Sequence, residues 1–292
     1  MPEIYRISLL ILSALMPVAA FAQGPALRIS PAASAPGSIV RLTLTDSTSS
    51  AGAVYGEMAG EQVHFRPTAR GVWVGYGPVP VDAIGEVNAF AIVGGMPDTL
   101  RASITIPKPP PSRRRGAPRA LAVSPRFTQP LDSATEARIA RENATAREIG
   151  RASHSTERMW TLPFLKPRES LVTSRFGSGR MFNGTLSSRH LGVDFRGQVG
   201  QPVRAANRGV VALVGDFFLA GNVVYIDHGE GIVTAYFHLS KTLVAKGDTV
   251  SRGQEIGLVG STGRVTGPHL HWSARYGAVT VNPLDLITVA KP

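Results

Sequence analysis

The sequence predicts a mainly β protein, with two β domains joined by a linker that contains one helix. Three observations support this prediction. Short runs of alternating apolar and polar residues, separated by Gly, Pro, Asn or Asp, fill both halves of the chain. Only one segment has the composition and the starting signal of a long helix. The chain has 292 residues, which exceeds one ordinary domain, and its 43% hydrophobic content is enough for buried cores.

Residues 1–22 have the pattern of a secretory signal peptide. An apolar run follows Arg6, is too short for a comfortable membrane span, and ends in the small-x-small cleavage pattern of residues 20–22. The alternative is an uncleaved membrane anchor, which Pro17 and the Ala-x-Ala ending disfavour. We therefore expect an exported protein, periplasmic or extracellular and associated with the cell wall, for which nucleic acid is an unsuitable partner.

Residues 23–107 are expected to form an N-terminal Ig-like β-sandwich that serves as an accessory domain. The alternation of apolar and polar residues in short runs is typical of half-buried antiparallel strands. The block holds 5 Lys or Arg and 6 Asp or Glu, without a cluster of catalytic residue types. Its single histidine, His64, is interpreted as an ordinary strand or surface residue. The clearest strands cover residues 39–45, 71–76 and 102–106.

Residues 108–130 are interpreted as a basic, proline-rich linker. The first twelve of them hold four prolines and five basic residues, a composition that can neither continue a sheet nor bury itself. The simplest interpretation of this charge run is a solvated tether, and the alternative is an arm that binds a polyanion.

Residues 131–159 are expected to form a helical linker. The helix is predicted from residue 131 to residue 153, and it opens with the capping-box arrangement Ser133-x-x-Glu136. Its apolar stripe is weak, which indicates a surface or inter-domain helix. His154, just past its end, is expected to face solvent.

The composition limits the chemistry further. With 31 Lys and Arg against 20 Asp and Glu, the formal net charge is +11, and the excess lies in the linker and in residues 160–292. In an exported protein this distribution suits an anionic cell wall better than nucleic acid. The chain has no cysteine, which excludes disulfide frameworks, Cys-type zinc sites and thiol nucleophiles.

Residues 160–292 are expected to form a C-terminal all-β domain rich in β-branched residues and glycine. The runs 222–227 and 232–237 are joined by a Gly-containing turn, the pattern of a hairpin. Within that turn His228 is interpreted as a structural residue, and Trp272 as a core residue. Gly192 is interpreted as a turn or close-packing residue.

Five of the seven histidines lie between positions 190 and 271. His190 with Asp194 forms H-x-x-x-D, and His269 with His271 forms H-x-H; because both spacings are even, each pair would project from one face of a strand. Imidazoles and a carboxylate without thiolate suit a divalent first-row ion, and zinc fits best. Three protein ligands would leave a position open for catalysis, whereas four would make a closed structural site.

Further segments in the same order carry a family resemblance. They are Ser174-Arg175-Phe176-Gly177, residues 189–195, 200–205, 221–229, 234–240 and 257–271. Together they resemble the lysostaphin-type (LytM-like) peptidoglycan endopeptidase family over about 120 residues, from Ser170 to Pro283. The first 150 residues of the chain lie outside this resemblance.

The resemblance implies that the C-terminal part is a LytM-like all-β metallopeptidase domain. It implies one zinc ion held by His190, Asp194 and His271, with His238 and His269 as the catalytic pair that does not bind the metal. The implied activity is that of an exported zinc metalloendopeptidase that hydrolyses peptide cross-links or stem peptides of bacterial peptidoglycan. Water activated by the zinc would attack the peptide carbonyl, with the two histidines sharing proton transfer and oxyanion stabilisation.

Two alternatives belong to other classes. The first is a catalytically silent LytM-like protein that binds the wall or activates an amidase; such relatives typically lose zinc ligands, whereas this sequence keeps all three. The second is a carbohydrate- or polyanion-binding adhesin, which would leave the histidines unexplained.

The sequence also departs from part of the family. Members close to lysostaphin place a Tyr shortly before the first metal ligand, but residues 177–189 contain no Tyr, only Phe182. This departure favours a stem-peptide cross-link, such as the D-alanyl to diaminopimelate bond, over a glycyl-glycine bridge as the substrate.

Overall fold

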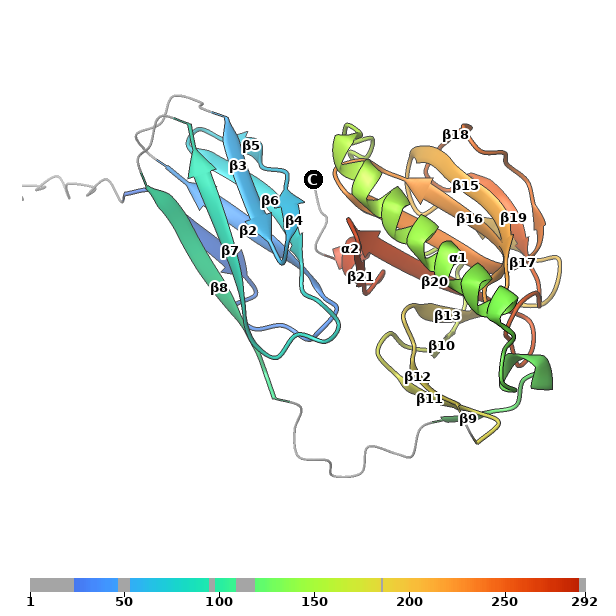
Figure 1. Ribbon diagram of the computed structural model, residues 1–292. Helices are drawn as coiled ribbons and strands as arrows, with labels where there is room; N and C mark the ends of the chain where they lie inside the picture. Colours follow the sequence, from blue (N-terminus) through green and yellow to red (C-terminus); the bar gives the residue numbers. More distant parts are fainter. Residues whose placement is uncertain (1–23, 47–52, 95–97, 109–118, 185, 289–292) are drawn as a thin grey trace, which may run out of the picture.

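The structure is a computed structural model that describes residues 24–46, 53–94, 98–108, 119–184 and 186–288 (Figure 1). The predicted signal peptide, residues 1–22, lies outside the described residues, as does the most basic part of the predicted linker. Within the described ranges, no helix has both the length and the apolar character needed to cross a membrane.

The N-terminal domain contains two four-stranded antiparallel sheets. The first sheet has the strand order β1 (Ala26–Ser30), β2 (Ile39–Thr45), β6 (Val72–Pro78), β5 (Arg66–Ala69). The second has the order β4 (Glu61–Val63), β3 (Val54–Met58), β7 (Gly85–Val93), β8 (Thr99–Ile106). Strand β2 shows how the pattern produces the core: its alternate residues Val40, Leu42 and Leu44 are fully buried.

The C-terminal domain is built on one ten-stranded sheet. Its main path runs β10 (Val172–Ser174), β13 (Val193–Arg196), β20 (His269–Tyr276), β17 (Ile232–Thr242), β16 (Gly221–Asp227), β15 (Gly209–Phe217), β18 (Thr249–Val250). Off this path lie β14 (Pro202–Arg204), β19 (Glu255–Val259) and β21 (Val279–Val281). The predicted hairpin is present as β16 and β17, and Trp272 is fully buried. The short helix α2 (Asp285–Thr288) follows the last strand. The mainly β fold class is confirmed.

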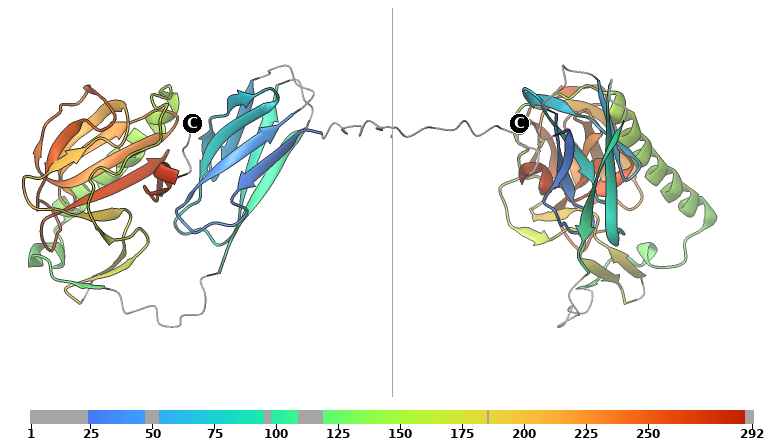
Figure 2. Two further views of the ribbon diagram at one scale, coloured as in Figure 1. Left: turned by 180° about the vertical axis from the view of Figure 1, so that it is seen from behind. Right: turned by 90° about the vertical axis from the view of Figure 1, so that its left-hand side faces the viewer.

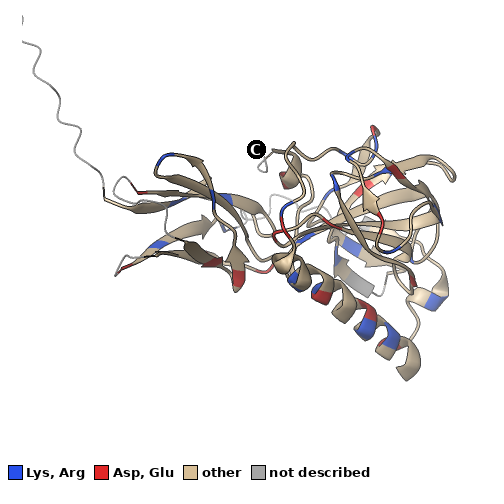
Figure 3. Ribbon diagram, turned by 90° about the horizontal axis from the view of Figure 1, so that it is seen from above, with Lys and Arg blue, Asp and Glu red and all other residues tan. Residues whose placement is uncertain are grey.

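The helix α1 (Ser133–Ala152) lies across one face of this sheet (Figure 1). Its N-cap is Asp132, one residue before the expected Ser133, and the Asp132 carboxylate accepts a hydrogen bond from Thr135 N at 2.7 Å. Ala146 and Ile149 pack on apolar residues of β16 and β17. Basic and acidic residues are interspersed along the helix (Figure 3), which explains the weak apolar stripe. A 3-10 turn, η2 (Ser153–Ser155), follows.

The structure differs from the predicted linker after residue 118. Strand β9 (Arg119–Leu121) pairs in parallel with β11 (Gly179–Phe182), which in turn pairs with β12 (Leu186–Arg189). The turn η1 (Pro125–Phe127) follows β9. Val123, Phe127 and Phe182 are buried together. The apolar residues behind the proline run therefore anchor this segment to the C-terminal domain.

The two domains lie side by side (Figure 2) and meet through polar contacts and through an apolar cluster in which Tyr76 of the sandwich packs on Trp160. Ile39 N donates to Asp285 at 3.0 Å. His154, which was expected to face solvent, lies instead between the domains, with Nε2 3.0 Å from Glu61 and Nδ1 2.9 Å from His64. Its ring fits because residues 231 and 277 are glycines whose missing side chains would collide with it.

Candidate metal centre

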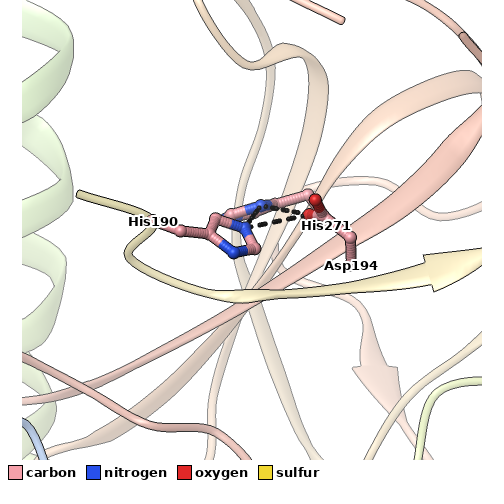
Figure 4. A group of neighbouring side chains, drawn as sticks. All are labelled: His190, Asp194 and His271. Atoms are coloured by element: carbon pink, nitrogen blue, oxygen red, sulfur yellow. Dashed lines mark hydrogen bonds and ion pairs between the residues drawn. The ribbon is translucent and has the colours of Figure 1, made fainter. Parts of the chain in front are cut away.

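Three predicted residues bring their ligand atoms together inside the C-terminal domain (Figure 4). His190 Nε2 lies 3.0 Å from both His271 Nδ1 and Asp194 Oδ1, and His271 Nδ1 lies 2.9 Å from Asp194 Oδ1. His190, Asp194 and His271 are 2%, 6% and 8% exposed. Two imidazoles and a carboxylate therefore converge on one buried point.

The sheet fixes two of these residues directly. Asp194 on β13 and His271 on β20 are paired across antiparallel strands, so their side chains project from the same face. His190 does not share a strand with Asp194, as the even spacing suggested, but lies one residue past β12. Backbone bonds hold it there: His190 N donates to Ser178 O at 2.8 Å, and Gly177 N donates to His190 O at 2.8 Å.

Hydrogen bonds also set the tautomer of His190. Its Nδ1 lies 3.0 Å from the carbonyl oxygen of Arg175 and 3.0 Å from Ser174 Oγ. Because a carbonyl oxygen can only accept, Nδ1 carries the hydrogen and the Nε2 lone pair faces Asp194 and His271. This arrangement, in which the outer ring nitrogen donates to a carbonyl, orients imidazoles at metal sites.

The geometry fits a small divalent ion. Tetrahedral zinc bonds of roughly 2.0–2.1 Å to nitrogen and oxygen place neighbouring ligand atoms about 3.3 Å apart. The observed separations of 2.9–3.0 Å are only a few tenths of an ångström shorter, so small side-chain shifts would open the site to this size. A nitrogen and oxygen donor set without thiolate agrees with zinc in a chain that has no cysteine.

Burial and hydrogen bonding put these groups in the protonation states that metal ligands need. Burial by itself raises the pKa of Asp194, but the adjacent His190 and His271 imidazoles outweigh it and hold the pKa well below its usual range. Burial lowers the pKa of His271 to about 4. The aspartate is therefore ionised and His271 neutral at pH 7, as coordination requires.

A second pair of imidazoles lies beside the first group. The rings of His238 and His269 are 4.9 Å apart, and His269 Nε2 lies 3.7 Å from Asp194 Oδ1. His238 Nδ1 lies 2.8 Å from Thr262 O, and His269 Nδ1 lies 2.8 Å from Gly267 O. Since both carbonyls can only accept, each Nδ1 is protonated and each Nε2 keeps a free lone pair. Burial and the nearby His269 and His271 lower the pKa of His238 well below its ordinary value.

A distortion of strand β17 turns His238 toward the site. Phe237 pairs with His271 and stacks on its ring, so the next residue of a regular strand would point to the other face. His238 has a φ of 64° instead, and the pairing of β17 with β16 shifts register between Tyr236 and Leu239, a span that contains His238. A β-bulge of this kind re-aims a side chain, and here it places His238 next to His269.

The absence of a side chain at Gly192 makes room for the imidazole of His271. A Cβ at Gly192 would lie 2.4 Å from His271 Nε2, closer than real atoms approach. Gly192 therefore serves the close packing that the sequence suggested, and the packing partner is the imidazole of His271. His228, by contrast, lies outside the cluster: its Nδ1 is 2.7 Å from Arg208 O and its Nε2 is 2.8 Å from Thr234 Oγ1.

Sequence reasoning missed Arg180. This residue of β11 forms an ion pair with Asp194 Oδ2, and the side chains are 15% and 9% exposed. The sequence pattern that could have pointed to Arg180 is its spacing from Phe182: two residues apart on a strand, both side chains project from one face.

A cleft of about 1510 Å³ lies between the sandwich and the C-terminal domain, and the residues that line it do not include His190, Asp194, His238, His269 or His271. One wall belongs to the sandwich and the other to the segment from Arg175 to Gly179, which is bonded to His190. Its charged lining residues are Asp82, Lys108, Arg175 and Arg189. With three cations and one carboxylate, the cleft favours anionic ligands.

Comparisons with known proteins agree on the C-terminal domain. Residues 188–283 match the sequence model of Peptidase family M23. The peptidoglycan DD-endopeptidase ShyA of Vibrio cholerae is 55% identical over 102 residues, which are 35% of this chain and 24% of that protein. The DD-carboxypeptidase/endopeptidase Mpg of Neisseria meningitidis is 47% identical over 97 residues, 33% of this chain and 22% of that protein. The matched region thus spans about a quarter of the length of these relatives.

The likeness to a solved structure includes both domains. A crystal structure of a Pseudomonas aeruginosa protein assigned to peptidase family M23 aligns with a TM-score of 0.64 and 25% identity. The alignment covers 87% of this chain and 95% of that one. The likeness therefore extends beyond the C-terminal domain to the sandwich.

Proposed function

Because residues 188–283 form a domain of peptidase family M23, we propose that this protein is an exported zinc metalloendopeptidase that hydrolyses peptide bonds of bacterial peptidoglycan. The observation that carries the proposal is that two further histidines lie beside a set of three metal ligands. His190, Asp194 and His271 converge as one set of metal ligands, and two further imidazoles with free Nε2 atoms lie beside them. A purely wall-binding protein has no need of the second pair.

In this proposal His190, Asp194 and His271 hold the zinc ion, and the ion when bound supplies a Lewis acid next to the scissile carbonyl. Neutral His238 can take a proton at Nε2, because its Nδ1–H is already donated to Thr262 O. His269 offers Nε2 in the same way from the rim of the site. The two rings thus share the removal of a proton from the attacking water and its delivery to the leaving amine.

The surroundings support an anionic, polymeric substrate. Stem peptides of peptidoglycan carry free carboxylates, and the cleft between the two domains, one wall of which is bonded to His190, is lined by Lys108, Arg175 and Arg189 besides Asp82. The relatives ShyA and Mpg are named as a DD-endopeptidase and a DD-carboxypeptidase/endopeptidase, so a bond between a D-alanine and the next amino acid is the cleavage site we propose. Export through residues 1–22 would place the protein where this substrate lies.

The test is product release from purified, cross-linked peptidoglycan sacculi. We expect the purified chain to release muropeptides whose masses identify the cleaved bond, a chelator to stop the release, and added zinc to restore it. An Asp194→Ala preparation controls for contaminating hydrolases.

A silent wall-binding protein would behave differently in the same assay. It would sediment with the sacculi and release nothing, with or without zinc, or it would stimulate release only when an amidase is added. Either result would refute the proposed peptidase activity.

A further inference from the structure

We propose that Arg180 is a positioning residue of the metal centre: it occupies Oδ2 of Asp194, so that this aspartate can offer a metal only Oδ1. The proposal adds a residue to the proposed function and rests on it for the catalytic consequence alone. Its structural part concerns how a metal ion is coordinated, whatever the substrate.

The two oxygens of Asp194 have different partners. Oδ1 lies 2.9 Å from His271 Nδ1 and 3.0 Å from His190 Nε2, the two atoms that converge on the metal position. Oδ2 accepts from a terminal guanidinium nitrogen of Arg180. Because the ion pair is largely buried, water does not screen it, and the two oxygens are not free to exchange roles.

The same nitrogen of Arg180 reaches a second ligand indirectly. It lies 3.4 Å from Ser174 Oγ, which is 3.0 Å from His190 Nδ1. Arg180 therefore orients Asp194 directly and His190 through the hydroxyl of Ser174. An arginine suits this role because the guanidinium stays charged and its planar geometry fixes the direction of several donors.

The fold holds Arg180 in this place. Phe182, two residues along β11, is buried against Val123 and Phe127, and the side chain at position 180 projects from the same face. Strand β9 closes the other edge of β11, with Arg180 in register with Arg119. Strand β9, which follows the proline-rich run, therefore helps to hold the hairpin of β11 and β12 that carries Arg180.

The chemical consequence concerns the coordination number. A carboxylate that binds a metal through both oxygens fills two positions, whereas one oxygen fills one. Catalytic zinc sites have three protein ligands and keep a further position open. By holding Oδ2, Arg180 keeps that position free for the reaction.

The experiment uses the full chain loaded with cobalt(II), a spectroscopic substitute for zinc. Four-coordinate cobalt(II) absorbs more strongly in the visible range than five-coordinate cobalt(II). We expect the wild-type chain and Arg180→Lys, whose ammonium still binds Oδ2, to give the strong four-coordinate spectrum. Arg180→Gln and Arg180→Met should give the weaker five-coordinate spectrum. Arg204→Gln, which removes an exposed pair with Glu255, is the matched control and should match the wild type.

Zinc affinity and kinetics separate positioning from simple damage. In the two neutral variants kcat should fall about 10- to 100-fold, the range typical for residues that orient metal ligands. KM and the zinc Kd should not rise, because the variants lose a positive charge near the ion and gain a second carboxylate oxygen. A structural defect would instead weaken zinc binding.

Three results bear on the outcome. Wild-type cobalt spectra in both neutral variants would overturn the proposal, and so would a raised zinc Kd with an unchanged kcat at saturating zinc. If Arg180→Gln does not melt cooperatively, Arg180→Met, whose apolar chain keeps the packing of the hairpin, decides alone. Failure of the peptidase proposal would show as an absence of muropeptide release from the wild type, while the spectral comparison would still stand.

Discussion

The two β domains bury apolar side chains in the same way but differ in the polar groups that they bury. Among the described residues of the sandwich only two charged or polar side chains are buried, Asp46 and Glu61, and Glu61 faces the neighbouring domain. The C-terminal domain buries His190, Asp194, His228, Glu230, His238 and His271 together with several uncharged polar residues. Buried ionisable groups oppose folding unless they are paired, so their concentration in one domain marks the site of chemistry.

The largest expected effect tests this difference with one buried aspartate from each domain. Asp194→Ala removes a metal ligand and should abolish stoichiometric zinc binding. We expect kcat of this variant to fall roughly 10³-fold or more, because without the metal the site loses several kcal/mol of transition-state stabilisation. Asp46→Ala in the sandwich should lower the melting midpoint yet keep zinc and activity. Metal analysis and muropeptide release measure both variants; equal losses of activity would mean that the sandwich takes part in the reaction.

The next effect concerns the strained backbone at His238. His238→Asn keeps a side chain that tolerates a positive φ but cannot act as a base. We expect kcat to fall about 10²- to 10⁴-fold, the range for losing a general acid or base. Zinc content should stay at one per chain and thermal stability should hold, because Asn suits this conformation. Undiminished muropeptide release would remove His238 from the mechanism.

Part of the fold and of the site could be predicted from the sequence. The two β domains, the single long helix and the hairpin of β16 and β17 follow from local periodicity and turn residues, which depend only on neighbours in sequence. Asp194 and His271 converge because they are paired across neighbouring strands. The sequence implied their shared role only through the family resemblance of the motifs.

The remaining features depend on contacts between distant segments. Arg180 meets Asp194 from strand β11, which pairs with β9, about sixty residues earlier in the chain. His64 and His154 meet at the domain interface, ninety residues apart in sequence, and burial is the main cause that lowers the pKa of His64 to about 4. Periodicity carries no information about such pairings, so both histidines were expected to be ordinary residues.

A smaller effect is expected from glycines near the metal. Gly192→Ala places a Cβ 2.4 Å from His271 Nε2 and should displace that ring, weakening zinc binding about 10- to 100-fold. Gly267→Ala is the matched control, since a Cβ there meets nothing within 4 Å. Competition with a zinc chelator measures both affinities. Equal Kd values for the two variants would show that His271 can move without loss.

The smallest effect concerns the interface that joins the two domains. Burial raises the pKa of Asp285 to about 6, while its carboxylate accepts a hydrogen bond from Ile39 N of the sandwich. A carboxyl whose pKa is raised by folding binds its proton more tightly in the native state. The stability that Asp285 contributes is therefore lost as the pH rises from about 4 through 6.

Asp285→Asn, which is neutral and still accepts from Ile39 N, removes this dependence. At pH 7.5 the variant should melt about 2 to 4 °C above the wild type, which corresponds to roughly 1 kcal/mol for a domain of this size. At pH 4.5 the two midpoints should coincide, because the wild-type carboxyl is then protonated as well. Asp98→Asn, an exposed change in the sandwich, should shift the midpoint at neither pH. A difference between Asp285→Asn and the wild type that is the same at both pH values would show that Asp285 stays ionised at the interface and that the contact between the domains does not depend on its protonation.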